Sequence, residues 1–349
     1  MKIIFTGGGT AGHVTPCIAL MKQLTNHELH YVGTNGIERQ LVQSCGVDVT
    51  YHTIDAVKLQ RKLTAKNLAI PFALAKSVRK CKQIVKKVAP DVVFSKGGYV
   101  GLPVVMASKL AHVPCLIHES DVTMGLANKV GRLVASKTLS AFACHKKATV
   151  VGSILREDIG KGDRIKGLAT MGFDGKKPVL LVLGGSLGAQ QLNNLVANCT
   201  QLKKQFDVFV ICGNGKDAKG LKSAPYVDNI TDLYAASDVA LTRCGSTTLA
   251  ELTKANVPFV GVPLVKNSRG EQIANGNYFA KQGCGVVLTN PTAKQLTNAV
   301  LTVYNNRDAY VTKQRRLAVD GRERVLDVIL SYQNTPNKIA TKKGSNPAH

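Results

Sequence analysis

Tryptophan is absent from the 349 residues of this chain, and aromatic residues make up only 5 % of them. Proteins that bind nucleic acid usually place aromatic residues among basic ones, or carry a zinc or helix-turn-helix pattern. The chain shows neither pattern, so we expect no nucleic-acid partner. Its 44 % hydrophobic and 19 % charged residues are typical of a globular protein, and its length suits two domains of about 150 residues.

Long apolar runs and paired cysteines are also missing. The longest apolar stretch, PVLLVL at 178–183, is far shorter than the roughly 20 residues of a membrane span, and the N-terminal MKIIFTGGG is too short for a signal peptide. The nine cysteines include no C-x-x-C and no paired spacing. This usage indicates thiols in a reducing, cytosolic compartment, with neither disulfides nor structural zinc.

Acidic residues are scarce. The chain has 22 Asp and Glu and 46 Lys and Arg, which give a formal net charge of +24. Such a charge attracts polyanions, here an anionic membrane surface or phosphorylated substrates. From 56 to 90 there are ten Lys or Arg and no acid, around the apolar LAIPFALA at 68–75. We expect this segment to contact an anionic membrane peripherally; the alternative is a basic helix whose apolar stripe packs on the core.

Strands, glycine loops and helices alternate in both halves of the chain. KIIFT at 2–6 predicts a strand, followed by glycines and a helix with Pro16 in its first turn, and a further strand ends at Gly33. The same order returns in KPVLLVLGGSLGAQQLNNLVANC and in DVALTRCGSTTLAELTKANVPFVGVPL. The alternation predicts the α/β class, with two Rossmann-like parallel-sheet domains that face each other across a cleft, 1–153 and 154–324.

Three glycine loops, at 7–12, 97–101 and 184–188, follow predicted strands and precede predicted helices. Bare backbone N–H groups at helix starts favour anions, so each loop is a candidate phosphate site; the alternative is a tight turn that needs glycine only for its backbone. The first loop also fits G-x-G-x-x-G. A dinucleotide site would need an acid at 31–34, where none occurs, and Glu38 comes too late.

Six motifs occur in order: GGGTAGHVTP, SKGGYVGLP, HESDVTMGLANK, VGSILRED, LVLGGSLGAQQLN and RCGSTTLAEL. Over about residues 3–280 the chain thereby resembles the glycosyltransferases of family 28, of the MurG type. The resemblance implies a GT-B fold and inverting transfer of GlcNAc from UDP-GlcNAc to the MurNAc 4-hydroxyl of lipid I, an undecaprenyl-linked acceptor. It further implies peptidoglycan synthesis at the cytoplasmic face of the cell membrane.

The resemblance also assigns the domains. The first would bind acceptor and membrane, the second UDP-GlcNAc, and the last helix, near 325–349, would pack back on the first. Alternatives within the fold are another lipid glycosyltransferase or a UDP-GlcNAc 2-epimerase. A non-catalytic nucleotide-sugar-binding protein is the alternative from another class.

Donor contacts follow from the resemblance. Glu251 would accept both ribose hydroxyls, the backbone of Ile230 would read uracil, and Ser186 would hold the diphosphate. Gln272 would read the hexose, and Glu271 stands where a second glutamine is commoner. The UDP-GlcNAc set is Thr10, Gly12, Arg156, Ser186, Gly188, Ile230, Arg243, Ser246, Thr247, Thr248, Glu251, Glu271, Gln272 and Asn275.

The reaction needs a base for the acceptor hydroxyl. His13 is the first candidate, because an ordinary histidine pKa near 6.5 suits proton transfer at neutral pH, and Glu119 and Asp121 are its rivals. His118 is interpreted as a packed strand-end histidine. No D-x-D motif occurs, so we expect no metal and no cofactor. The acceptor set is Gly97, Gly98, Tyr99 and Asn128.

Overall fold

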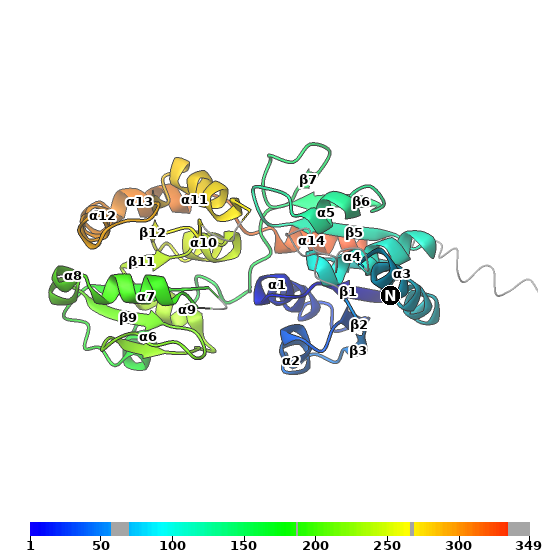
Figure 1. Cartoon of the computed structure of the whole chain (residues 1–349), viewed down its shortest axis with the longest axis horizontal. Helices are drawn as coiled ribbons and strands as arrows, with labels where there is room; N and C mark the ends of the chain where they lie inside the picture. The colour runs from blue at the N-terminus through cyan, green and yellow to red at the C-terminus, as the bar shows by residue number, and fades with distance from the viewer. Residues whose placement is uncertain (57–69, 186–187, 266–268, 334–349) are drawn as a thin grey trace, which may run out of the picture. The chain divides into compact units, whose positions relative to one another are not determined.

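The computed structural model describes residues 1–56, 70–185, 188–265 and 269–333 (Figure 1). The chain divides into two compact units. The first comprises Met1–Ser120, Met124–Ile154 and the chain from Gly321, and the second comprises Asp121–Thr123 and Leu155–Asp320. Each unit holds one parallel β-sheet, so the predicted α/β class with two parallel-sheet domains is confirmed.

The sheet of the first unit has the spatial order β3-β2-β1-β4-β5-β6-β7. Its strands are β1 (Lys2–Thr6), β2 (Glu28–Gly33), β3 (Thr50–Thr53), β4 (Val92–Ser95), β5 (Cys115–Glu119), β6 (Lys137–Ser140) and β7 (Thr149–Val150). The helices are α1 (Ala11–Met21), α2 (Ile37–Gln43), α3 (Ile70–Val88), α4 (Gly98–Leu110), α5 (Leu126–Gly131) and α14 (Arg322–Leu330).

Alternate residues of β1 enter two separate cores. Ile3 and Phe5 pack with α1, α2 and α14, whereas Ile4 packs with α3 and α4 on the other face. Both faces of this sheet are therefore covered, which is why its strands read as continuous apolar runs. Although α14 is far away in the sequence, it lies beside this sheet (Figure 1) and contributes Val325 and Ile329 to the core.

Helix α1 begins earlier than the sequence predicted. We expected Pro16 in its first turn, but α1 starts at Ala11 and Pro16 is its sixth residue. The reason lies in the glycine loop: Gly9 adopts a φ of +85°, which turns the chain early enough for the helix to begin two residues later. Gly12, expected in the phosphate-binding loop, consequently lies in the first turn of α1.

The second unit has the sheet order β10-β9-β8-β11-β12-β13. Its strands are β8 (Val179–Leu183), β9 (Asp207–Ile211), β10 (Lys222–Ala224), β11 (Val239–Thr242), β12 (Phe259–Gly261) and β13 (Gly285–Val287). Its helices are α6 (Arg164–Met171), α7 (Gln190–Ala197), α8 (Thr200–Gln205), α9 (Ile230–Ala236), α10 (Ser246–Lys254), α11 (Glu271–Lys281), α12 (Ala293–Asn305) and α13 (Arg307–Arg315). Leu180 and Val182 of β8 pack with residues of α7, α8 and α12 in the core.

Helix α3 contains the described part of the basic segment. It buries Val78, Cys81 and Val85 in the core, while Phe72 in its first turn is 81 % exposed. Residues 57–69, which include the start of LAIPFALA, lie outside the described residues, as does the tail from 334. Within the ranges that the structure describes, no helix has both the length and the hydropathy needed to cross a membrane.

Candidate active site

Two glycine loops of the first unit lie side by side. They follow β1 and β4, which are paired in parallel with Thr6 opposite Ser95, so both loops leave the same edge of the sheet. The loops are in close contact: a Cβ added to Gly98 would lie 2.7 Å from the carbonyl oxygen of Gly8 and 3.5 Å from Nδ1 of His13. This edge therefore brings His13 to the junction of the two glycine loops.

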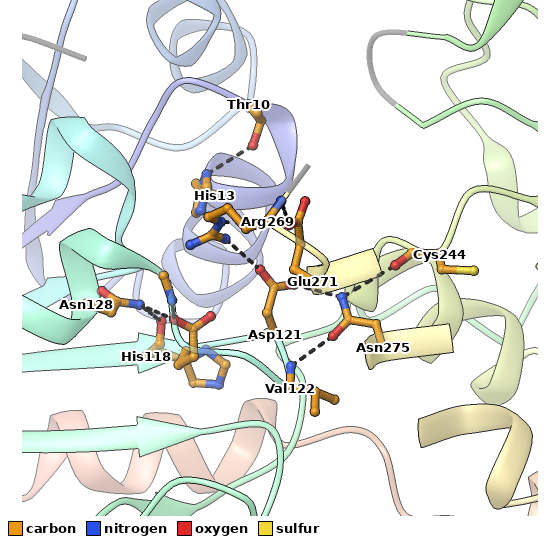
Figure 2. Close-up of polar contacts among 12 residues, drawn as sticks. Thr10, His13, His118, Asp121, Val122, Asn128, Cys244, Arg269, Glu271 and Asn275 are labelled. Atoms are coloured by element: carbon orange, nitrogen blue, oxygen red, sulfur yellow. Dashed lines mark hydrogen bonds and ion pairs between the residues drawn. The ribbon is translucent and has the colours of Figure 1, made fainter. Parts of the chain in front are cut away.

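His13 lies in the first turn of α1 and is partly exposed. Its Nδ1 is 3.0 Å from Oγ1 of Thr10, a hydrogen bond shown in Figure 2. A bond at one ring nitrogen fixes the orientation of the imidazole and determines which tautomer it adopts. Thr10 can thus orient the imidazole of His13, as a base in an active site requires.

Two buried side chains, Tyr31 and Glu38, hold the first glycine loop by hydrogen bonds to its backbone. The hydroxyl of Tyr31 donates to the carbonyl of Gly7 at 2.6 Å. The carboxylate of Glu38, 1 % exposed, accepts from the N–H groups of Thr34 at 3.0 Å and Gly9 at 3.4 Å, and from the Thr34 hydroxyl. These bonds lower the pKa of Glu38 in spite of its burial, so the loop is held by a carboxylate.

Lys96 is a buried cation under the same loops. It is 2 % exposed, and a Cβ added to Gly7 would lie 3.1 Å from the Cβ of Lys96. His118 at the end of β5 is fully buried and shares a hydrogen bond with the carbonyl oxygen of Gly152 at 3.0 Å. Burial, and then the charge of Lys96, hold the pKa of His118 well below its ordinary value, so it is a packed neutral histidine.

Glu119 and Asn128 form a buried pair. Glu119 is 4 % exposed, and its Oε2 accepts from the N–H of Gly125 at 2.9 Å and from Nδ2 of Asn128 at 3.0 Å (Figure 2). Gly97 has a φ of +91°, and a Cβ there would lie 2.7 Å from Oδ1 of Asn128. Asn128 therefore packs closely against Gly97 of the second glycine loop, and a base role for Glu119 would require it to leave Gly125 and Asn128.

The equivalent loops of the second unit follow β8 and β11, which pair with Leu183 opposite Thr242. Gly188 has a φ of +66°, and a Cβ there would lie 2.2 Å from the carbonyl oxygen of Cys212, so only glycine fits at this turn. Ser186 lies outside the described residues. The loop leads into α7, whose N-terminus is suited to an anion.

Glu251 of α10 lies in a charged cluster with Tyr234 and Arg156. The hydroxyl of Tyr234 donates to Oε2 of Glu251 at 3.0 Å. Burial raises the pKa of Glu251, while the charge of Arg156 and the Tyr234 hydrogen bond oppose that rise. Nε of Arg156 lies 3.5 Å from Oδ1 of Asp158. The cluster presents an acceptor and a cation, as a nucleoside diphosphate site needs.

Asp121 belongs to the second unit together with the start of α11. Asn275 is fully buried: its Nδ2 donates to Oδ1 of Asp121 at 3.0 Å, and its Oδ1 accepts from the N–H of Val122 at 2.8 Å (Figure 2). Arg269 lies 3.6 Å from Asp121 and 3.8 Å from Glu271. The amide of Asn275 is thus fully engaged by protein, which favours a positioning role over a direct sugar contact.

The remaining donor candidates surround β11 and β12. Arg243 donates to the carbonyl oxygens of Val262 and Pro263 at 3.0 and 3.4 Å, and Gln272 accepts from the N–H of Leu264 at 2.8 Å. Among the residues that the structure describes, the amide N–H₂ of Gln272 makes no hydrogen bond, so it can be offered to a ligand. The first turns of α9 and α10 contain Ile230, Ser246, Thr247 and Thr248.

The structure therefore separates the predicted site residues into two groups. Those in the first unit are Thr10, Gly12, His13, Gly97, Gly98, Tyr99, Glu119 and Asn128. Those in the second are Asp121, Arg156, Gly188, Ile230, Arg243, Ser246, Thr247, Thr248, Glu251, Glu271, Gln272 and Asn275. Sequence reasoning missed Lys96, Tyr234 and Arg269, and considered Glu38 only as a ribose ligand. The available signal was for Lys96, a charged residue between an apolar strand and the glycines at 97–98.

Within the part of the chain that the structure describes, no group of three or more His, Cys, Asp or Glu side chains is arranged to hold a metal ion. Seven of the nine cysteines are buried thiols, and burial raises the pKa of Cys17 and Cys244 to about 12. These thiols are therefore structural apolar residues.

Known proteins similar to the chain cover nearly its whole length. Residues 3–140 match the glycosyltransferase family 28 N-terminal domain, and residues 179–329 match the family 28 C-terminal domain. Two curated relatives carry the name UDP-N-acetylglucosamine--N-acetylmuramyl-(pentapeptide) pyrophosphoryl-undecaprenol N-acetylglucosamine transferase. The Lachnoclostridium phytofermentans protein is 39 % identical over 89 % of this chain and 92 % of its own. The Clostridium botulinum protein is 37 % identical over 95 % of this chain and 99 % of its own.

A solved structure shows the same fold. The crystal structure of Acinetobacter baumannii MurG matches with a TM-score of 0.73 and 24 % identity, covering 95 % of this chain and 99 % of the other. The N-terminal match falls almost entirely in the first unit, and the C-terminal match spans most of the second unit and continues into α14. The chain belongs to glycosyltransferase family 28.

Proposed function

We propose that this chain transfers GlcNAc from UDP-GlcNAc to the 4-hydroxyl of MurNAc in lipid I, with inversion, and so makes lipid II for peptidoglycan. The observation that carries the proposal is His13, bonded to Thr10 where two glycine loops meet. The curated relatives, named as transferases of this specificity over nearly the full chain, support the choice of substrates.

In the proposed reaction His13 takes the proton of the acceptor hydroxyl as its oxygen attacks the anomeric carbon. The bond from that carbon to the UDP oxygen breaks, and the new glycosidic bond forms on the opposite face. A positioned base of this kind accelerates a reaction by about 10²–10⁴-fold. Asp121 remains the second candidate base, although Arg269 and Asn275 already contact its carboxylate.

The donor would bind to the second unit. Glu251 accepts the ribose hydroxyls, Arg156 and the amides from Gly188 onward balance the diphosphate charge, and Gln272 donates to the hexose. These roles need no metal ion to stabilise the leaving UDP, because helix N-terminal N–H groups and a guanidinium provide preorganised positive charge. For the acceptor, the glycine loop around Gly97 and Tyr99 is proposed as the binding surface.

Docking to the membrane is proposed for α3. The helix contains six Lys or Arg and no acid, and the apolar stripe from Val78 onward packs on the core. Phe72 in the first turn is 81 % exposed, so lipid contact would combine this small apolar surface with the exposed Lys and Arg residues of the helix. We propose that the chain binds peripherally at the cytoplasmic face of the cell membrane, where lipid I is available.

The function is tested by UDP release from UDP-GlcNAc with and without a lipid I analogue, and with EDTA in a parallel sample. We expect release that depends on the acceptor and survives EDTA. Release that needs no acceptor would indicate another UDP-sugar enzyme, such as the 2-epimerase. Binding of UDP-GlcNAc without turnover would indicate a non-catalytic binding protein.

The base is tested with His13→Ala. We expect kcat to fall by about 10²–10⁴-fold while UDP-GlcNAc binding is retained. His112→Asn is the matched control, because His112 is exposed at the end of α4 and adopts a left-handed φ of +58° that asparagine tolerates. A near-normal kcat in His13→Ala would remove His13 from the mechanism.

Vesicles separate the two components of the proposed membrane binding. Co-sedimentation with vesicles that contain anionic phosphatidylglycerol should decrease as salt rises, and should be weak with phosphatidylcholine alone. Phe72→Ser should weaken binding at every salt concentration by removing apolar contact. Binding that ignores both salt and anionic lipid would contradict the electrostatic part of the proposal.

A further inference from the structure

Tyr234 is a buried tyrosine whose hydroxyl has one specific partner. It lies in α9 and is 3 % exposed, and its hydroxyl donates to Oε2 of Glu251 in α10 at 3.0 Å. A buried tyrosine hydroxyl normally requires such a partner. The bond therefore ties α9 to the carboxylate that the proposed function assigns to the donor nucleotide.

No other described side chain holds the carboxylate of Glu251 by a hydrogen bond. Arg156 acts on it only through its charge, since the ion pair of Arg156 is with Asp158. Within the described residues, Nη2 of Arg156 is buried and has no hydrogen-bond partner. Tyr234 is consequently the group in the described ranges that determines which way the Glu251 carboxylate points.

Burial shifts the pKa of both members of the pair upward. Burial and the nearby charge of Glu251 raise the pKa of Tyr234 well above its ordinary value, so Tyr234 is a donor at neutral pH. Burial also raises the pKa of Glu251, and the charge of Arg156 and then the hydrogen bond from Tyr234 limit that rise. The hydroxyl thus helps to keep Glu251 ionised, which is the state that accepts hydrogen bonds at both oxygens.

The ionised carboxylate has about four lone-pair sites, of which Tyr234 uses one. Oε1 accepts no hydrogen bond from the described residues, and Oε2 has a second site. Two hydroxyl groups on adjacent carbons can therefore bind to Glu251 together, one at each oxygen. A cis-diol such as that of ribose matches this arrangement, provided that the carboxylate does not rotate.

We propose that Tyr234 is a positioning residue, which fixes the Glu251 carboxylate so that both its oxygens can accept the two ribose hydroxyls of the donor. The inference rests on the proposed function, because it needs a nucleotide at Glu251. It adds that specificity for the ribose diol depends on a residue that does not itself contact the donor.

The test compares the wild type and Tyr234→Phe for binding of UDP and of 2′,3′-dideoxy-UDP by calorimetry. Phenylalanine keeps the ring and removes only the hydroxyl. We expect Tyr234→Phe to weaken UDP binding about tenfold, the loss expected for one hydrogen bond to a charged group, and dideoxy-UDP by less than about twofold. In turnover, the KM for UDP-GlcNAc should rise with kcat nearly unchanged.

Tyr304→Phe is the matched control. Tyr304 packs against Phe206 at the core of the same unit, and this packing contact is made by its ring, which phenylalanine keeps. This variant should bind UDP as the wild type does. In Tyr234→Phe alone, the loss of UDP affinity on acidification should begin at a higher pH, because the pKa of Glu251 rises further without its donor.

The outcomes distinguish the inference from the function on which it rests. An equal loss of UDP and dideoxy-UDP in Tyr234→Phe, or an unchanged affinity and pH profile, would overturn the positioning role. If the wild type binds neither ligand, the proposed nucleotide site itself fails. If the wild type prefers UDP to dideoxy-UDP and Tyr234→Phe loses that preference, the inference stands.

Discussion

Replacement of Glu38 by glutamine would remove the charge under the first glycine loop and keep its size. The carboxylate accepts from the N–H of Thr34 at 3.0 Å, from the Thr34 hydroxyl and, at a longer 3.4 Å, from the N–H of Gly9. Glutamine retains one acceptor oxygen, but its N–H₂ group cannot accept. One of the two carboxylate oxygens is therefore replaced by a donor that faces other donors.

The size of the effect follows from these contacts. Glu38 is 1 % exposed, so water cannot replace a lost partner. A hydrogen bond to a charged group contributes about 1.5–3 kcal/mol, and a buried donor left unpaired costs about 1–3 kcal/mol. Since the Gly9 contact is long and glutamine keeps one acceptor, we expect Glu38→Gln to destabilise the first unit by about 2–4 kcal/mol.

The assay is hydrogen exchange of peptides from 3–21, because it reports the first unit without assuming that both units unfold together. Exchange of the amides from 7 to 10 should accelerate most, since Glu38 holds this loop directly. Glu28→Gln is the matched control: Glu28 is an exposed carboxylate of the same unit, paired with Lys2 and His30, and should cost less than about 1 kcal/mol.

Acidification provides a second check with a defined sign. The hydrogen bonds lower the pKa of Glu38 below its ordinary 4.5. Its contribution to stability is therefore complete above about pH 4.5 and is lost as the pH falls through the folded-state pKa. The difference between wild type and Glu38→Gln should shrink in that range. A loss no larger than that of Glu28→Gln, with unchanged exchange at 7–10, would refute the reasoning.

Two further predictions concern packing and pH. A Cβ on Gly167 would lie 2.0 Å from the carbonyl oxygen of Asp232, so Gly167→Ala should force α6 away from α9 and destabilise the second unit by about 2–3 kcal/mol in urea unfolding; an unchanged midpoint would contradict it. Burial, and then the nearby His30 and Lys87, lower the pKa of His52 below 6.5. The thermal stability of the wild type relative to His52→Gln should therefore fall as the pH drops below about 6.5 and stay constant above pH 8; parallel pH curves would exclude this effect.

Features that depend on near neighbours in the chain were predictable. The strand at 2–6 and the strand that ends at Gly33 occur as expected, because apolar periodicity reports burial directly. The start of α1 was not predictable, because it depends on the left-handed turn at Gly9. A run of three glycines does not show which of them turns the chain. Pro16 was therefore placed in the wrong turn of the helix.

The sequence allowed candidate site residues to be chosen by residue type and by their position in loops, but it did not reveal their hydrogen-bond partners. His13 and Thr10 are three residues apart, so their contact could be expected once a helix starts between them. Asn275 was expected to face the sugar, yet its amide is bonded to Asp121 and Val122, more than 150 residues earlier. Such a pairing depends on which loops meet at the sheet edge, and no local pattern encodes it.

The sequence by itself determined the two α/β halves, the glycine loops between strands and helices, and the membership of the family. It could do so because hydropathy period and backbone freedom are properties of short segments. Only the tertiary structure decided that Glu38 and Lys96 support the first loop and that Tyr234 holds Glu251. A buried polar group needs a hydrogen-bond partner, and which residue becomes that partner depends on how distant segments pack together.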